Sequence, residues 1–166
     1  MNLEYVFSYC ALLQTFGWLL LIIAPRWIWT NRAIWFLFVP VLGVLYLYLI
    51  ISQHDKMAGG WSLPAGFNSL TSVAAYFQNP SLLLAGWLEF QALDLLIGGW
   101  EVRDAQNLRI FHGWVIVCLI MTWWSGPIGL LFYLATRITI LCLRSGIRDL
   151  VTAIRMNPRI QKNATK

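Results

Sequence analysis

The stretch AIWFLFVPVLGVLYLYLIIS, residues 33–52, contains no charged side chain. A helix needs roughly 20 predominantly apolar residues to cross the hydrocarbon core of a bilayer, so this stretch alone predicts a transmembrane helix. Across the 166 residues, 59% are hydrophobic and 11% are charged, which is far from the usual composition of a soluble domain. The sequence therefore predicts an integral membrane protein.

Three further apolar stretches are long enough to cross the bilayer. The four expected spans are residues 5–24, 33–52, 81–100 and 111–134. Pro40 is expected to kink the second span, and Gly126 with Pro127 to bend the fourth, because proline lacks the amide donor of the helix. Between the second and third spans, residues 57–80 are rich in small and polar side chains and predict an ordered loop with a short helix at 69–77.

Beyond the fourth span, arginines recur at helical spacing with apolar residues between them: Arg137, Arg144, Arg148 and Arg155. This pattern is typical of an amphipathic helix at the membrane interface. The predicted fold is thus all-α, an integral membrane bundle of four transmembrane helices with an amphipathic basic C-terminal helix. We divide it into a four-span domain, residues 1–143, and a basic interfacial tail, residues 144–166.

The basic residues also predict an orientation. Four spans place both termini on one side, which would hold Lys56 and the basic tail. The positive-inside rule then places both termini in the cytoplasm. The net charge of +5 is concentrated in the tail, which favours contact with anionic lipid headgroups over contact with nucleic acid.

Four acidic residues lie in or beside the third span: Glu89, Asp94, Glu101 and Asp104. Ionisable side chains are costly within a bilayer and usually mark a functional site. At about 100° per residue, one continuous helix places all four within an arc of roughly 140°. Carboxylates that lie close together in a low dielectric cannot all be ionised, so one can act as an acid beside another that acts as a base. A single acid could instead be a hydrogen-bond anchor to another helix.

The predicted catalytic residues are two buried carboxylates and two groups at the mouth of the site: Glu89, Asp94, Asp104 and His112. The first two would form the acid and base pair. His112 begins the fourth span and could shuttle a proton, act as a nitrogen ligand, or simply form a structural hydrogen bond. Arg103 and Arg109 would balance the charge of the acids. The spacing of these residues matches no metal-binding motif, and we predict no metal site.

Most of the ten tryptophans lie near the predicted ends of spans, as expected for an interfacial aromatic belt. Trp87, Trp123 and Trp124 lie deeper. Their rings could pack in the core of the bundle or against a flat, polyene-like ligand.

Two stretches resemble a known membrane family: GFNSLTSVAAYFQNPSLLLAGWLEFQALDLLIGGWEVRDA, residues 66–105, and IFHGWVIVCLIMTWWSGPIGLLFYLATR, residues 110–137. The landmarks are AGW at 85–87, GPIGLL at 126–131, and Asp94, Asp104 and His112. With these landmarks the chain resembles the abscisic-acid-deficient-4-like (neoxanthin synthase) membrane protein family.

The resemblance implies a four-helix membrane protein and, in plants, conversion of the epoxycarotenoid violaxanthin to the allenic neoxanthin. We therefore expect a carotenoid or isoprenoid isomerase, in which an acid protonates the epoxide oxygen and a base removes a proton from the polyene end. Such an isomerisation needs no cofactor. The expected substrate contacts are three tryptophans and two arginines: Trp87, Arg103, Arg109, Trp123 and Trp124.

The chain departs from the family pattern at Glu89, where the family carries a histidine, so the substrate could be another carotenoid or an unrelated isoprenoid. The resemblance favours a bacterial inner membrane or a photosynthetic membrane as the location. The expected partners are membrane lipids and a hydrophobic, carotenoid-like small molecule.

The alternative is a non-catalytic protein that holds a pigment or lipid, or that assembles with a larger membrane complex. The acids would then be structural partners of Arg103 and Arg109. Small residues that permit close helix approach could support a homo-oligomer: Gly98, Gly99, Gly126 and Gly129.

Overall fold

The structure, a computed structural model, describes residues 2–52 and 69–156. These residues form helices and the turns between them, which confirms the predicted all-α class. In chain order the elements are α1 (Leu3–Ile23), α2 (Ile28–Ala33), the π-helical segment η1 (Ile34–Phe38), α3 (Val39–Ser52), α4 (Leu70–Tyr76), α5 (Pro80–Asn107), α6 (His112–Trp124) and α7 (Gly126–Met156). The short helix expected at 69–77 is present as α4, and the rest of that predicted loop, 57–68, lies outside the described residues.

Four helical stretches are long and apolar enough to cross a membrane, which confirms the predicted number. They are Leu3–Ile23, Ile28–Ser52, Pro80–Asn107 and Gly126–Ile147. The first three overlap the predicted spans closely, because long uncharged runs carry a strong sequence signal.

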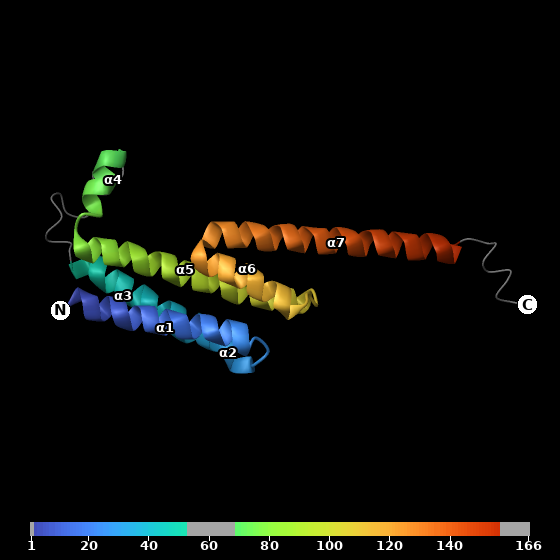
Figure 1. Cartoon of the computed structure of the whole chain (residues 1–166), viewed down its shortest axis with the longest axis horizontal. Helices are drawn as coiled ribbons and strands as arrows, with labels where there is room; N and C mark the ends of the chain where they lie inside the picture. The colour runs from blue at the N-terminus through green and yellow to red at the C-terminus, as the bar shows by residue number, and fades with distance from the viewer. Residues whose placement is uncertain (1, 53–68, 157–166) are drawn as a thin grey trace, which may run out of the picture.

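The fourth predicted span, residues 111–134, is wrong because the chain does not pass Gly126 and Pro127 as one bent helix. Instead α6 ends at Trp124, Ser125 is extended (φ −152°, ψ 92°), and α7 runs back beside α6 (Figure 1). Proline is favoured in the first turn of a helix, where its missing N–H is not needed. With 13 residues, α6 is about 20 Å long, shorter than the roughly 30 Å hydrocarbon core.

The irregularity expected at Pro40 takes the form of a π-helical segment, Ile34–Phe38, directly before it. The proline ring crowds the carbonyl of Phe36, four residues earlier, and offers that carbonyl no N–H. Wider π turns are a common way for a helix to absorb such a disruption. The helix therefore continues through α3 to Ser52.

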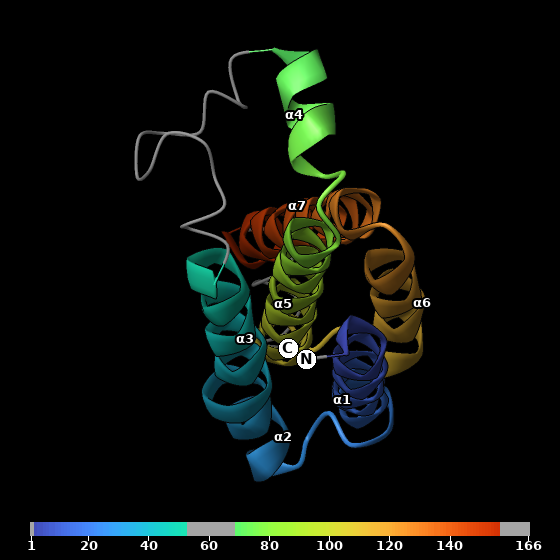
Figure 2. The same ribbon diagram turned by 90° about the vertical axis from the view of Figure 1, so that its left-hand side faces the viewer.

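Helix α5 is the centre of the bundle. It contacts α1, η1, α3, α6 and α7, and Figure 2 shows α1, α3, α6 and α7 arranged around it. One apolar cluster includes Trp18 and Leu95, and a second includes Leu42 and Leu88. The buried side chains of α5 are therefore held between several helices, whereas others, such as Phe90 and Leu93, remain exposed.

The glycines that the sequence suggested for contacts between copies lie at contacts between helices of the same chain. A Cβ atom on Gly98 would lie 2.7 Å from the Trp18 ring, and one on Gly129 would lie 2.1 Å from the backbone nitrogen of Thr122. The small residues therefore allow α5 to approach α1 and allow α7 to approach α6.

The start of α1 and the end of α7 lie at opposite ends of the molecule (Figure 1). The expectation that both termini lie on one side assumed that a single crossing helix follows α5. Instead, α6 runs back along part of α5, and α7 then runs in the same direction as α5. Lys56, on which that expectation also rested, lies outside the described residues. Because α7 runs unbroken past residues 143 and 144, the proposed division of the chain at that point stays a prediction.

Candidate functional site

A small pocket lies halfway along α5, between this helix and the α6–α7 turn. Its volume is about 250 Å³. Aromatic rings and a single ionisable group line it: Trp87, Phe90, Gln91, Asp94, Trp123, Trp124, Ser125, Gly126 and Pro127. The structure thus brings Asp94 together with the three tryptophans that the sequence singled out.

The absence of a side chain at Gly126 allows the α6–α7 turn to close on Asp94. A Cβ atom at this position would lie 1.9 Å from Oδ1 of Asp94, well inside van der Waals contact. Helix α7 begins at Gly126, so the carboxyl group lies beside the positive end of that helix. The turn therefore fixes the position of Asp94, and the start of α7 can stabilise the carboxylate that forms when Asp94 gives up a proton.

The tryptophans form the walls of the pocket, and their outer edges are exposed. The Trp123 ring stacks on Trp18, with centroids 6.1 Å apart and planes inclined by 18°, which anchors it to α1. Phe7 supports Trp87 at 6.2 Å. Trp124 is 92% exposed. Since α5 is a candidate membrane span, a ligand could enter this pocket from the hydrocarbon region.

A pair of glutamines lies next to the pocket. Nε2 of Gln14, which is buried in α1, donates a hydrogen bond to Oε1 of Gln91 on α5, one turn before Asp94. Sequence reasoning missed this pair, although an uncharged polar residue within each of two apolar spans was the available signal. The bond fixes the register of α1 against the helix that carries Asp94.

Glu101 lies two turns beyond Asp94 and is fully buried. The hydroxyl of Thr122 donates to its Oε1 at 2.9 Å, whereas Oε2 has no hydrogen-bond partner among the described residues. The sequence placed Glu101 on the acidic face but did not select it as a site residue. The structure makes it the most enclosed acid of α5, and it connects α5 to α6.

Asp104 connects α5 to α7 through hydrogen bonds and an ion pair. Its Oδ2 accepts hydrogen bonds from the Tyr133 hydroxyl and from Nε of Arg137, each at 2.8 Å. The sequence had matched the acids with Arg103 and Arg109, whereas the partner here is Arg137. Sequence reasoning missed this contact because it depends on the reversal of the chain between α6 and α7.

Glu89 does not join Asp94. Its side chain is exposed, and it interacts electrostatically with Tyr46 of α3 and Tyr76 of α4. Five residues along a helix turn the side chain by about 140°, so Glu89 and Asp94 face different neighbours. The structure therefore does not assemble the predicted pair of acids in one site.

The remaining predicted residues lie at the far end of α5. His112 Nε2 is 2.9 Å from the carbonyl oxygen of Ile22, and His112 lines a separate pocket together with Arg109. Arg103 lines a third pocket, beside Arg32. Within the described part of the chain, no group of three or more His, Cys, Asp or Glu residues could hold a metal ion.

The comparison with known families gives one match. A family model described as ABA DEFICIENT 4-like matches residues 5–133. Neither the proteins with curated descriptions nor the solved structures contain a match. The matched region runs from α1 into α7 and includes every residue that lines the Asp94 pocket.

Proposed function

Because the chain belongs to the ABA DEFICIENT 4-like family, we propose that it is an intramembrane isomerase acting on a carotenoid or another isoprenoid. The single observation that supports this proposal is the pocket that places the Asp94 carboxyl group among Trp87, Trp123 and Trp124 in the middle of a membrane-spanning helix. Aromatic faces suit a flat polyene, and the carboxyl group supplies the chemistry.

One carboxyl group is sufficient for the proposed reaction. The protonated Asp94 donates its proton to an epoxide oxygen as the carbon–oxygen bond breaks. The resulting carboxylate then removes a proton from the neighbouring polyene carbon, which restores the acid and forms a new carbon–carbon double bond to the carbon that lost the oxygen. The substrate gains one proton and loses one, so the reaction is an isomerisation that consumes neither an oxidant nor a reductant.

This proposal replaces the paired-acid scheme expected from the sequence. Glu89 lies on another face, and Asp94 is the only ionisable group among the described residues that line the pocket. Gln91 is the second polar side chain on the α5 wall, and its amide could hold a hydroxyl group on the end ring of the substrate. Asp104 and His112 take no part in the proton transfer.

A second candidate function is the non-catalytic holding of a pigment or lipid, alone or within a larger membrane complex. The lack of a second ionisable group among the described residues of the Asp94 pocket favours it, because most acid–base sites divide the two roles between two residues. In that case the tryptophans alone would retain the ligand.

Expression in carotenoid-producing bacteria separates the two candidates. The chain and its Asp94→Asn variant are purified in mild detergent, and both the bound pigment and the total carotenoid extract are analysed by chromatography and mass spectrometry. A new isomer that disappears with Asp94→Asn supports the isomerase. Pigment that is bound unchanged by both proteins supports the holding role. If the protein yields no new isomer and binds no pigment, the result contradicts a carotenoid as the ligand in either candidate function.

We also infer that the termini lie on opposite sides of a multi-pass membrane protein. Arginines gather at the end of the bundle from which α7 emerges: Arg26, Arg32, Arg103, Arg109, Arg137 and Arg144. The positive-inside rule makes this end cytoplasmic and places the start of α1 on the other side. Whether the membrane is a bacterial inner membrane or a photosynthetic one stays a prediction.

A further inference from the structure

A second and larger pocket lies at the end of the bundle, where the α1–α2 and α5–α6 connections meet. Its volume is about 840 Å³. Two hydrogen bonds hold its frame: Gln106 Nε2 donates to the carbonyl oxygen of Pro25 at 2.6 Å, and the His112 ring bonds the carbonyl oxygen of Ile22. The pocket therefore belongs to the packed bundle, although it opens at the level where a membrane helix ends.

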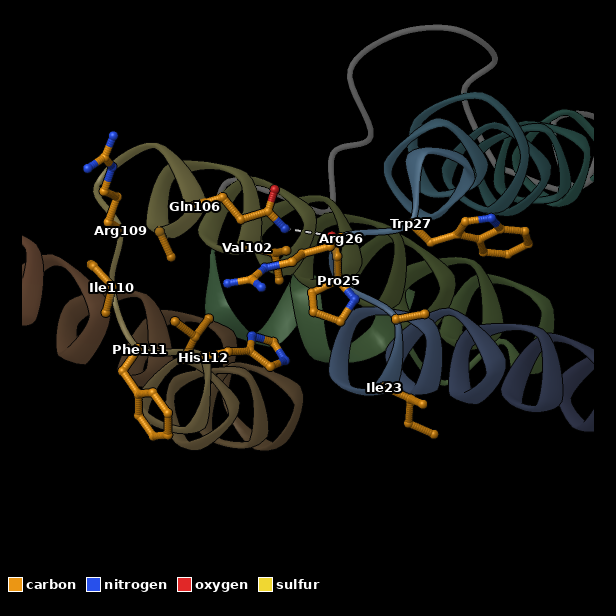
Figure 3. A pocket seen from close by; sticks show the side chains of 13 residues that line it. Ile23, Pro25, Arg26, Trp27, Val102, Gln106, Arg109, Ile110, Phe111 and His112 are labelled. Carbon is orange, nitrogen blue, oxygen red and sulfur yellow. Dashed lines mark hydrogen bonds between the residues drawn. The ribbon is translucent and has the colours of Figure 1, made fainter.

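The charged side chains that line this pocket are basic. Arg26, Arg109 and His112 line it, and none of its described lining residues is acidic. Figure 3 shows the Arg26 guanidinium directed into the space in which His112 lies, while Arg109 points outward from the rim. Neither guanidinium group has an ion pair or hydrogen bond to another described residue, whereas Arg137 is paired with Asp104. Two unpaired guanidinium groups beside one cavity favour an anionic ligand.

The backbone conformation at Arg109 is unusual for a residue with a side chain. Arg109 has φ 51°, the only positive φ of a non-glycine residue in the described chain. It follows the C-cap Leu108 of α5, and the hydrogen bonds from its N–H to Gln106 and from Ile110 N–H to Ala105 close a Schellman motif. Glycine is the usual residue at this position. A residue with a long cationic side chain thus occupies a backbone conformation that favours glycine. Such strained positions are often found at functional sites.

His112 can contribute a further contact. The Ile22 carbonyl can only accept a hydrogen bond, so Nε2 of His112 carries the hydrogen and Nδ1 remains available. The same pocket has apolar walls from Ile23, Trp27, Phe111 and Val115. Its chemistry matches a molecule with an anionic head and an apolar body.

We propose that this pocket binds the phosphate headgroup of an anionic membrane lipid. Arg26 contacts the phosphate inside the pocket, the exposed Arg109 side chain turns inward from the rim to meet it, and the apolar walls contact the first part of the acyl chains. This site is separate from the Asp94 pocket and does not depend on the proposed isomerase activity. Its phosphate chemistry is shared by free inorganic phosphate, and the experiment below distinguishes the two sources.

The test measures lipid binding to the full chain in mild detergent by native mass spectrometry. The probes are dioctanoyl phosphatidylglycerol, dioctanoyl phosphatidylcholine with the same chains, and inorganic phosphate. The variants are Arg26→Gln and Arg109→Gly. Arg32→Gln is the matched control, because Arg32 lies at the same end of the bundle but lines a different pocket and stacks on Trp29. Arg109→Gly should fold normally, since glycine adopts this φ without strain.

The expected result is that phosphatidylglycerol binds at least ~10-fold more tightly than phosphatidylcholine, because both lipids carry the phosphate but the choline group adds a positive charge that the arginines repel. Arg26→Gln and Arg109→Gly should each remove most of this preference, and Arg32→Gln should retain it. Equal binding of the two lipids, an unchanged preference in Arg109→Gly, or an equal loss in Arg32→Gln would overturn the proposal. Binding of inorganic phosphate alone would also overturn it, by assigning the site to a free anion.

Discussion

Gly126, in the α6–α7 turn, has no side chain, and this allows Asp94 to lie close to the start of α7. The acid lies within the membrane-spanning part of α5, and the turn closes over it with no room for a Cβ atom. The pocket proposed as the site therefore depends on this residue as much as on the carboxyl group.

We predict that Gly126→Ala destabilises the protein by ~1–3 kcal/mol, because the added methyl group overpacks the contact with Asp94. Gly43→Ala is the control, since a Cβ atom at that position would meet no neighbouring atom within 4 Å among the described residues. It should be neutral or slightly stabilising, as alanine is a better helix former than glycine. The measurement is thermal unfolding of both variants in detergent. Equal stability of the two variants would show that the turn does not pack on Asp94 as described.

The sequence singled out Asp94 and the deep tryptophans, which line one pocket in the structure, but it could not assign the neighbours of Glu89. Helical phase gives the direction of each side chain on α5 but not the neighbour that it meets. Glu89 and Asp94 shared a broad arc in the sequence, whereas α3 and α4 lie beside the first and the α6–α7 turn beside the second. The partner of Asp104 was hidden for the same reason, because Arg137 comes near only when α7 folds back.

Among the elements, the hairpin of α6 and α7 differs most from expectation. Residues 111–134 are apolar enough to be read as one span, and a Gly-Pro pair is compatible with a kink as well as with a break. Composition does not separate these cases. The break at Ser125 follows from tertiary packing, in which Gly129 admits the backbone of Thr122 and lets the two helices run side by side. The other spans were predictable because each is a single unbroken apolar run.

A cross-linking experiment tests the hairpin directly. Trp114 Nε1 donates a hydrogen bond to Thr136 Oγ1 at 3.0 Å. In one continuous helix these residues would be about 33 Å apart, at 1.5 Å per residue. With the native cysteines at 10, 118 and 142 replaced by serine, Trp114→Cys and Thr136→Cys should react together with a short bifunctional thiol reagent.

The control pair is Trp114→Cys with Ile147→Cys, in which the second residue lies three turns farther along α7 and should not cross-link. The readout is the intact mass of the protein after reaction. Failure of the 114–136 pair to react, while each single cysteine is labelled by a monofunctional reagent, would contradict the reversal of the chain.

For the whole molecule, the hairpin changes the path of the chain, because α6 returns only part of the way along α5 and α7 then leaves at the end where α5 finishes. Reporter fusions that are active on only one side of the membrane should show the N-terminus outside the cytoplasm and the C-terminus inside it, because the described arginines gather at the end from which α7 leaves. Reversing this charge asymmetry by moving arginines to the N-terminus should weaken the orientation. Both termini on one side would contradict the inferred topology.

The measurement that tests the central proposal most directly is the rate of epoxycarotenoid conversion by purified protein in lipid vesicles, compared between the wild type, Asp94→Asn and Glu89→Gln. We expect Asp94→Asn to lower the rate by ~100-fold or more, as for loss of a general acid–base. Glu89→Gln, which removes an acid on another face of α5, should keep most of the activity. Full conversion by Asp94→Asn would contradict the assignment of Asp94 as the proton donor and acceptor.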